Sequence, residues 1–418
     1  MIAVATAGCA KPLDQYTHSF DQVTIRDVTI VDVDRGALLD HRDVRIESGR
    51  ILSIEPTSAH APGGPAIDAR GKFLLPGLAD MHVHHYTGDD GELYDDEDLF
   101  LYLANGVTTV RNMTGSERDL LAKKEIGSGR LIGPRYYTCG PQLGAWVETV
   151  AEARAAVQEQ HRAGYDCIKV YSGIIKPAFR AIIETADRLE MPVAGHPQIR
   201  LGEDENLRLQ SMEHLEESLM LFDRRPPDQA LHGAFVGRLA REGVFVTPTL
   251  HVSTFYDCIT EAGRERLLRR AETRFLADYW YDRVRDPNDR AYRNLGRVGY
   301  ARLKETHDLG LQFAPFLDRN GVRLLLGTDT TWFAVPGFSV HDELELLVRA
   351  GLSPRDALMT GTSNVADFLG DTHNSGRIAV GKNADLLLLD ANPLIDIRNS
   401  RKIAGVMIGR YWIDRSGI

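Results

Sequence analysis

Short strand-like runs alternate with helical segments through the middle of this 418-residue chain. Each run is apolar, or alternates apolar and polar residues, over the few positions typical of a half-buried or buried strand. Eight runs fit this description: 73–84, 107–113, 135–139, 167–171, 193–196, 211–214, 244–250 and 322–329. Typical helical segments are 150–163, 176–189 and 341–350. Because parallel strands need such crossovers, the pattern predicts an α/β fold with a closed (β/α)8 TIM barrel.

One connection is longer than a plain crossover. The stretch 254–318 is charged and has a helical pattern. Since long connections in compact domains usually carry structure of their own, we expect extra helices there, near the barrel mouth.

The two ends of the chain carry further strand patterns. They lie at 23–54, 376–390 and 405–413. Neither end could bury its apolar face alone, so the two are expected to fold together. The prediction is a small β-sandwich domain of residues 19–72 and 375–418, joined to a barrel domain of residues 73–374.

Composition excludes several classes of partner. The chain has 49 Lys and Arg against 59 Asp and Glu, for a formal net charge of −10, and no basic run. Nucleic acid and anionic membrane surfaces are therefore not expected to bind. No apolar run approaches the roughly 18–20 residues of a transmembrane segment. The four cysteines form no CxxC pair, which predicts neither a disulfide framework nor a zinc knuckle: Cys9, Cys139, Cys167 and Cys258.

The N-terminus allows two interpretations. Residues 1–9 are mostly apolar and end in Ala-Gly-Cys, like the end of a lipoprotein export segment. They lack a basic leader and are too short for a complete signal. Residues 1–18 are either a disordered terminus of a cytoplasmic protein or a residual export segment of an exported lipoprotein.

The first predicted barrel strand ends in two histidines. Alternate residues of a strand share a face, so Asp80, His82 and His84 point the same way. Active sites of barrel proteins lie at this C-terminal end of the strands. Two neutral imidazoles there suit a divalent metal ion, and the other interpretation is a pair of buried structural histidines.

A lysine lies in the middle of the fourth predicted strand. Ile168 and Val170 alternate with Cys167, Lys169 and Tyr171, which places the latter three toward the barrel interior. A buried, unpaired ammonium group would be strongly destabilising. Lys169 is therefore either paired with an inner carboxylate or converted by CO2 into a carbamate that could bridge two metal ions.

Three more predicted strands end in residues that bind metals. His196, His214 and Asp329 close the fifth, sixth and eighth strands. A lone histidine at any of these places would more often be structural. Four imidazoles, one lysine and one carboxylate at the same end of one barrel predict a metal centre.

With these six positions the chain resembles the amidohydrolase superfamily, in its two-metal form with a carboxylated lysine. The similarity extends over nearly the whole chain and includes segments 106–111, 246–250 and 381–386. Within the superfamily the chain is most similar to the imidazolonepropionase-related branch, which contains prolidase-like and Xaa-Arg or Xaa-Lys dipeptidases. The resemblance implies two divalent ions, of the zinc kind, with these ligands: His82, His84 and Asp329 for the more buried ion, His196 and His214 for the more exposed one, and carboxylated Lys169 between them.

The resemblance also implies a reaction. A metal-bridging hydroxide would hydrolyse an amide-type C–N bond in a small molecule such as a dipeptide, an N-acyl amino acid or a related amide. Asp329 would be both ligand and catalytic base, and would pass the proton to the leaving amine.

Three alternatives stay open. Deaminases and cyclic-amide hydrolases of the same superfamily, acting for example on an imidazolone or a lactam, are the nearest. Deaminases commonly carry a glutamate three residues after the fifth-strand histidine, where this chain has Ile199, and lack the lysine present here as Lys169. A non-catalytic barrel scaffold is the third, but such relatives usually lose metal ligands.

Two residues are candidates for substrate binding. Tyr171 could donate a hydrogen bond to a substrate carbonyl, or be a core tyrosine. His251 follows the seventh strand, where specificity loops begin, or has a capping role. Dipeptidase-like relatives commonly have a tyrosine just after the fifth-strand histidine, where this chain has Pro197 and Gln198.

Other polar features allow a structural role. Arg111 could bind a substrate carboxylate, but pairing with Asp80 is the favoured prediction. The acidic run 89–98 either attracts cationic substrates or is a solvated loop. Some relatives form dimers, so a homo-oligomer is possible by analogy.

Overall fold

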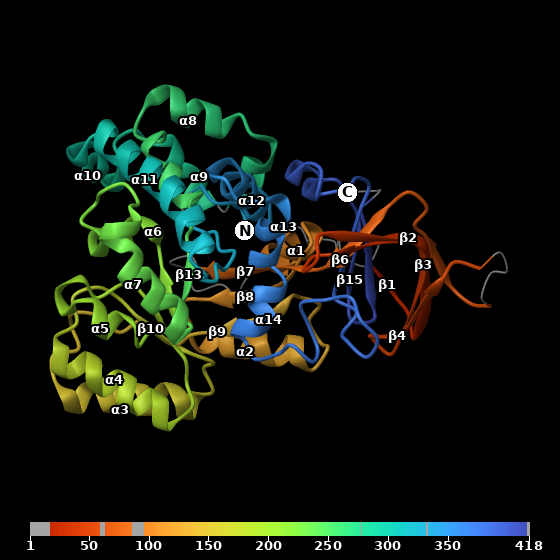
Figure 1. Cartoon of the computed structure of the whole chain (residues 1–418), viewed down its shortest axis with the longest axis horizontal. Coiled ribbons are helices and arrows are strands. Elements are labelled where there is room, and N and C mark those ends of the chain that lie inside the picture. The colour runs from red at the N-terminus through yellow and green to blue at the C-terminus, as the bar shows by residue number, and fades with distance from the viewer. Residues whose placement is uncertain (1–16, 59–62, 86–95, 277, 332, 416–418) are drawn as a thin grey trace, which may run out of the picture.

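The computed structural model describes residues 17–58, 63–85, 96–276, 278–331 and 333–415 (Figure 1). Residues 1–16 and most of the acidic run, 89–95, lie outside this part of the chain. The fold is α/β, with parallel strands and helices in one part and a larger mixed sheet in the other.

Seven of the eight predicted barrel strands form two parallel sheets. One contains β7 (Leu78–Val83), β8 (Val107–Asn112) and β9 (Arg135–Thr138). The other contains β10 (Ile168–Val170), β11 (Val193–Gly195), β12 (Ser211–Glu213) and β13 (Phe245–Thr247). Isolated parallel bridges, Cys139 with Cys167 and Leu143 with Val170, link β9 to β10. The two sheets therefore run side by side in chain order.

The eighth predicted strand is not a regular strand. Within 322–329 only Leu324 forms a β-bridge, to Val246. The amide of Leu326 donates to Thr360 rather than to a neighbouring strand, at 2.8 Å. The amide of Asp329 still donates to the carbonyl oxygen of His82, at 2.7 Å. Among the described residues, therefore, the segment lies between β13 and β7 without completing a closed eight-stranded sheet.

Helices follow the strands much as predicted. Two of the three named segments are α3 (Val150–Ala163) and α4 (Lys176–Arg188), and the third is α12 (Phe338–Ala350), which begins three residues early. Thr149 caps α3 by accepting from the amide of Glu152 at 3.1 Å. The remaining helices of this part, outside the long connection, are α1 (Asp96–Ala104), α2 (Glu117–Gly127), η1 (Ile199–Leu201), α5 (Glu203–Asn206), α6 (Leu215–Ser218), η2 (Leu219–Phe222), α7 (Gln229–Glu242), α13 (Pro354–Thr360) and α14 (Ser363–Phe368).

The long connection carries helices, as expected. They are η3 (Val252–Tyr256), α8 (Glu261–Leu268), η4 (Ala271–Phe275), α9 (Asp278–Arg285), α10 (Arg290–Val298) and α11 (Tyr300–Arg319). No helix in the described ranges has both the length and the hydropathy of a membrane span.

Both chain ends contribute to one nine-stranded sheet, in the order β1-β16-β15-β14-β6-β2-β3-β4 with β5 beside β2. Its strands are β1 (Thr17–Ser19), β2 (Gln22–Asp32), β3 (Ala37–Glu47), β4 (Arg50–Pro56), β5 (Ala66–Asp68), β6 (Phe73–Pro76), β14 (Leu386–Leu389), β15 (Ile403–Ile408) and β16 (Tyr411–Asp414). Thr17 already pairs with Ile413, two residues before the predicted start of this unit.

Two predicted strands are each divided in the structure. The run 405–413 forms β15 and β16, which turn at Gly409, where φ is +57°. The run 73–84 forms β6 and β7 and is interrupted at Gly77. A Cβ there would lie 2.2 Å from the Thr108 side chain, so only glycine fits where the chain passes from the mixed sheet into β7.

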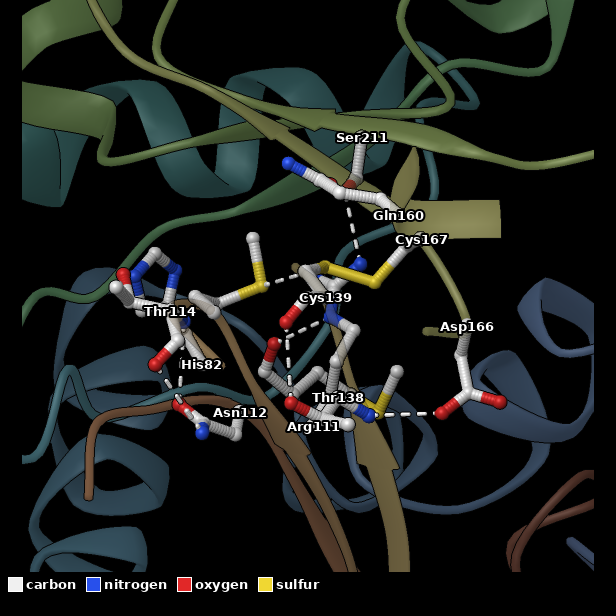
Figure 2. Close-up of a disulfide and its surroundings, with 12 residues drawn as sticks. His82, Arg111, Asn112, Thr114, Thr138, Cys139, Gln160, Asp166, Cys167 and Ser211 are labelled. Atoms are coloured by element: carbon white, nitrogen blue, oxygen red, sulfur yellow. Dashed lines mark hydrogen bonds between the residues drawn. A yellow bond between two sulfur atoms is a disulfide. The ribbon is translucent and has the colours of Figure 1, made fainter. Parts of the chain in front are cut away.

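A disulfide links Cys139 and Cys167, against the prediction from the cysteine spacing (Figure 2). The two residues are 28 positions apart, but they follow β9 and precede β10, and their Cα atoms lie 4.3 Å apart. Spacing along the chain could not reveal this pair because the parallel neighbours of a sheet are brought together only by the fold.

Candidate metal centre

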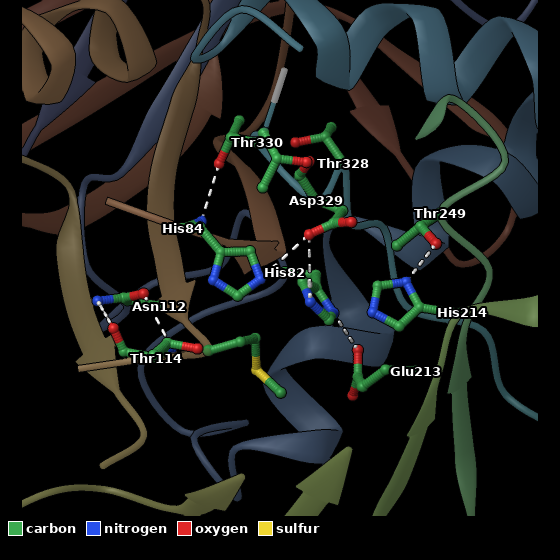
Figure 3. A network of polar contacts seen from close by, with 12 residues as sticks. His82, His84, Asn112, Thr114, Glu213, His214, Thr249, Thr328, Asp329 and Thr330 are labelled. Atoms are coloured by element: carbon green, nitrogen blue, oxygen red, sulfur yellow. Dashed lines mark hydrogen bonds and ion pairs between the residues drawn. The ribbon is translucent and has the colours of Figure 1, made fainter. Parts of the chain in front are cut away.

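Four histidines and one aspartate lie close together, and Figure 3 shows three of the histidines, His82, His84 and His214, with Asp329. The rings of His82 and His214 lie 4.4 Å apart, and those of His196 and His214 4.7 Å apart. Oδ1 of Asp329 lies 3.1 Å from Nε2 of His84 and 3.6 Å from Nε2 of His82. In particular, His82, His214 and Asp329 each offer a ligand atom within 4.8 Å of the others, so they could hold one metal ion.

The backbone is strained where these strands end. His214 and Asp329 have φ of 65° and 49°, and Thr249 has φ of 47°. Non-glycine residues rarely adopt this left-handed conformation, and such residues cluster at functional sites.

Three of the imidazoles have a partner on Nδ1. Glu213 lies 2.7 Å from His82, Glu217 lies 2.7 Å from His196, and the Thr249 hydroxyl lies 3.0 Å from His214. When Nδ1–H donates to these acceptors, the lone pair of Nε2 is left for a metal ion. Nε2 of His82 is buried and has no hydrogen-bond partner among the described residues.

Burial keeps these imidazoles neutral. It lowers the pKa of His82 well below the ordinary value and that of His214 to about 4. The positive charge on Lys169 acts in the same direction on both rings and on His196. Metal ligation requires neutral imidazole, so the environment suits it.

Arg111 and Glu213 form a buried ion pair beside His82. Arg111 donates to Oε1 of Glu213 at 2.8 Å and to the carbonyl oxygen of Met81 at 2.7 Å. The predicted pairing of Arg111 with Asp80 is therefore wrong. Asp80 instead accepts from the hydroxyl and the amide of Thr328, the latter at 3.0 Å. Arg111 lies in β8 and Glu213 in β12, so this ion pair links the two parallel sheets.

Lys169 is 1% exposed, and its Nζ makes no hydrogen bond within the described residues. Burial lowers the pKa of this amine to about 8, with Arg111 acting in the same direction and Glu213 and Asp329 against it. The ion-pair interpretation would require a hydrogen-bonded carboxylate, and none of the described carboxylates is hydrogen-bonded to Nζ.

Only one of the two predicted substrate residues lies against the histidine cluster. The Tyr171 ring is 4.1 Å from the His196 ring, and its side chain is 40% exposed. His251 lines a separate cavity of about 460 Å³ together with Arg270, Asp342 and Arg349, and none of the six predicted ligands lines that cavity.

Glu213, Glu217 and Thr249 were not among the predicted site residues. One signal was available for the first two. Each is a glutamate within three residues of His214, in a segment whose strand end had already been assigned to the metal site. The partner of Glu217, however, is His196 on the neighbouring strand, which only the fold reveals.

The fold and these side chains define a class: an α/β protein with a buried site suited to metal ions at the ends of parallel strands. The chain belongs to the amidohydrolase family, whose model matches residues 73–411. It is therefore a hydrolase acting on carbon–nitrogen bonds by metal-dependent amide hydrolysis, and the family that the ligand pattern predicted is confirmed.

Three curated relatives illustrate the similarity. Ochratoxinase of Aspergillus niger is 24% identical over 379 residues, covering 78% of this chain and 72% of that protein. Imidazolonepropionase of Rubrobacter xylanophilus is 26% identical over 373 residues, covering 82% and 81%. N-acyl-D-aspartate deacylase of Alcaligenes xylosoxydans xylosoxydans is 33% identical over 130 residues, which are 31% of this chain and only 25% of the deacylase.

Solved structures have the same fold. A bottromycin amidohydrolase superposes with a TM-score of 0.74 at 26% identity, covering 96% of this chain and 87% of the other. A Xaa-Pro dipeptidase with methionine in its active site superposes with a TM-score of 0.73 at 18% identity, covering 94% and 100%.

Proposed function

We propose that this chain is a binuclear amidohydrolase that cleaves a linear amide bond in a dipeptide, an N-acyl amino acid or a related small amide. The observation that carries the proposal is Lys169, whose buried Nζ has no hydrogen-bond partner in the described ranges. The positive charge of Lys169 lowers the pKa of His82, His196 and His214, so Lys169 is close enough to act on all three rings.

Carboxylation would convert the unpaired amine of Lys169 into a group that can bind metal ions. The neutral amine adds to the carbon of CO2 while one C=O π bond opens, a proton passes from the nitrogen to water, and the new N–C bond joins the side chain to a carboxylate. The product is an anion with two ligand oxygens in a cluster of neutral imidazoles. This chemistry requires a neutral amine, and the buried environment of Lys169 favours one.

The donor set fits two zinc-like ions. Imidazole nitrogens and carboxylate oxygens are the ligands zinc prefers. His82, His84 and Asp329 would hold the more buried ion, His196 and His214 the other, with carboxylated Lys169 shared. When bound, the ions would lower the pKa of a water molecule and polarise the scissile carbonyl.

Asp329 is the residue proposed to move the proton. Although burial favours its neutral form, the hydrogen bond from His84 and the nearby imidazoles hold the pKa of Asp329 well below its usual range. Its carboxylate is therefore ionised at neutral pH and can accept the proton of the attacking water. It then delivers that proton to the nitrogen of the leaving amine.

The domain arrangement is proposed as well. Residues 73–374 would form a closed (β/α)8 barrel, and residues 19–72 with 375–418 a small β-sandwich, to which β6 at the start of the first range also contributes a strand. The bridges between β9 and β10, and between Val246 and Leu324, support closure of the barrel. The pairing of β1 with β16 supports a unit built from both ends.

A substrate screen tests the reaction. Zinc-loaded protein would be incubated with dipeptides, N-acyl amino acids, lactams and aryl amides, and amine, carboxylate and ammonia would be measured. We expect equal amounts of free amine and carboxylate from at least one linear amide. Ammonia alone would identify a deaminase, activity on lactams alone a cyclic-amide hydrolase, and no turnover at all would favour a scaffold.

A further inference from the structure

Two large aromatic side chains are exposed next to the metal centre. Trp146 is 57% exposed and Tyr171 is 40% exposed. Their rings stack at 6.5 Å with an interplanar angle of 29°, and the Tyr171 ring lies 4.1 Å from that of His196. The three rings therefore form a row that leads from the protein surface to a proposed metal ligand. We call Trp146 and Tyr171 the aromatic platform.

The loop after β9 holds Trp146 in place. The amide of Tyr171 donates to the carbonyl oxygen of Leu143 at 2.6 Å, which ties this loop to the end of β10. The indole rests on Gly144, where a Cβ would lie 2.5 Å from the ring. A side chain at position 144 would therefore have to displace the indole.

Gln198 fixes the other end of the row. Its Nε2 donates to the carbonyl oxygens of Tyr171, at 2.9 Å, and of His196, at 3.0 Å. Gln198 itself is 2% exposed. This residue, which departs from the pattern of dipeptidase-like relatives, thus ties the backbone at Tyr171 to the backbone at His196.

Scattered exposed apolar residues are common and need no explanation. Here, however, the two exposed rings stack on one another, and the Tyr171 ring packs at a tilt of 43° against the ring of His196, a proposed metal ligand. Glu217, the carboxylate beside His196, is already engaged with Nδ1 of His196 at 2.7 Å and with the Ser172 hydroxyl at 3.3 Å. What the platform offers a substrate is therefore aromatic surface rather than an unpaired charge.

We propose that the aromatic platform binds a planar apolar group, such as a phenyl ring, on the substrate beside the scissile amide. This inference rests on the proposed function, since it takes His196 to lie at the reacting centre. Trp146 and Tyr171 would then select amides that carry an aromatic side group over those with a small one.

The test compares matched substrates in the zinc-loaded enzyme. N-acetylphenylalanine and N-acetylalanine differ only in the phenyl ring. We expect Trp146→Ala to lower kcat/KM for the phenyl substrate by roughly tenfold, mainly through KM, because aromatic stacking contributes on that scale. Activity toward the alanine substrate should stay within about twofold. Trp146→Phe should retain most of the preference, and Tyr300→Ala, at a 40% exposed tyrosine elsewhere, should change neither.

Gly144→Ala supplies a second variant, which keeps the tryptophan but displaces it. It should lose the phenyl preference as Trp146→Ala does. An equal loss on both substrates, or an unchanged preference in both variants, would overturn the proposal.

Binding separates this inference from the proposed reaction. The fluorescence of Trp146, taken as the difference between parent and Trp146→Phe, should be quenched by N-acetylphenylalanine and not by N-acetylalanine, even in Asp329→Asn protein that does not turn over. Quenching without any hydrolysis by the parent would retain the platform and reject the proposed reaction. Hydrolysis without selective quenching would reject the platform.

Discussion

Nδ1 of His82 lies 2.7 Å from Oε2 of Glu213, and both side chains are completely buried. The other oxygen of Glu213 accepts from Arg111 and from the Ser211 hydroxyl. This series of hydrogen bonds holds the His82 ring so that its Nε2 atom faces the other histidines and Asp329. Such outer hydrogen bonds orient metal ligands and raise their basicity.

Replacing this carboxylate should weaken the metal centre. Glu213→Gln keeps the shape but cannot balance Arg111 or hold a charge-assisted hydrogen bond to His82. We expect zinc affinity to fall by about 10–100-fold, the usual effect of losing such a partner. Chelator competition well below the unfolding temperature measures it. Glu55→Gln, an exposed glutamate in β4, is the matched control and should bind zinc like the parent.

The proton-transfer role of Asp329 predicts a loss of turnover without loss of fold. Asp329→Asn keeps the side-chain volume but removes the base, and general-base catalysis contributes about 10²–10⁴-fold. We expect a kcat decrease of that size with an unchanged circular dichroism spectrum. A variant as fast as the parent at equal metal content would exclude Asp329 from the mechanism.

The disulfide between Cys139 and Cys167 should stabilise the strand that carries Lys169. It closes a loop with a sequence separation of 28, for which chain entropy predicts roughly 3–4 kcal/mol. The double variant Cys139→Ala with Cys167→Ala should therefore unfold at lower denaturant concentration than the oxidised parent. Identical denaturation midpoints for the two proteins would show that the bond contributes nothing to stability.

Much of the barrel region follows from local sequence patterns. The periodic segments gave α3 and α4 nearly residue for residue, because amphipathic spacing and the Thr149 cap are local signals. The run 322–329 failed as a strand because its backbone groups bond to Thr360, Val246 and His82 in turn. A pattern of apolar residues cannot show which partner each amide will find.

The candidate site, like the fold, could be predicted from the sequence only in part. The histidines and Asp329 could be named because they follow strand-like runs, and the C-terminal ends of neighbouring parallel strands lie at the same edge of a sheet. Their supports could not: the prediction paired Arg111 with Asp80, and nothing in the sequence pattern indicated Glu213 as its partner. Trp146 was missed for a similar reason: its place beside Tyr171 depends on a loop contact between Leu143 and the end of β10.

The number of metal ions per chain tests the central claim most directly. Protein prepared with ample zinc and bicarbonate, freed of loosely bound metal, should contain about two zinc ions per chain. Lys169→Met, which keeps an apolar side chain of similar length, should fold and yet lose at least one of them. One ion or none in the parent, or two ions retained by Lys169→Met, would contradict a binuclear centre bridged by carboxylated Lys169.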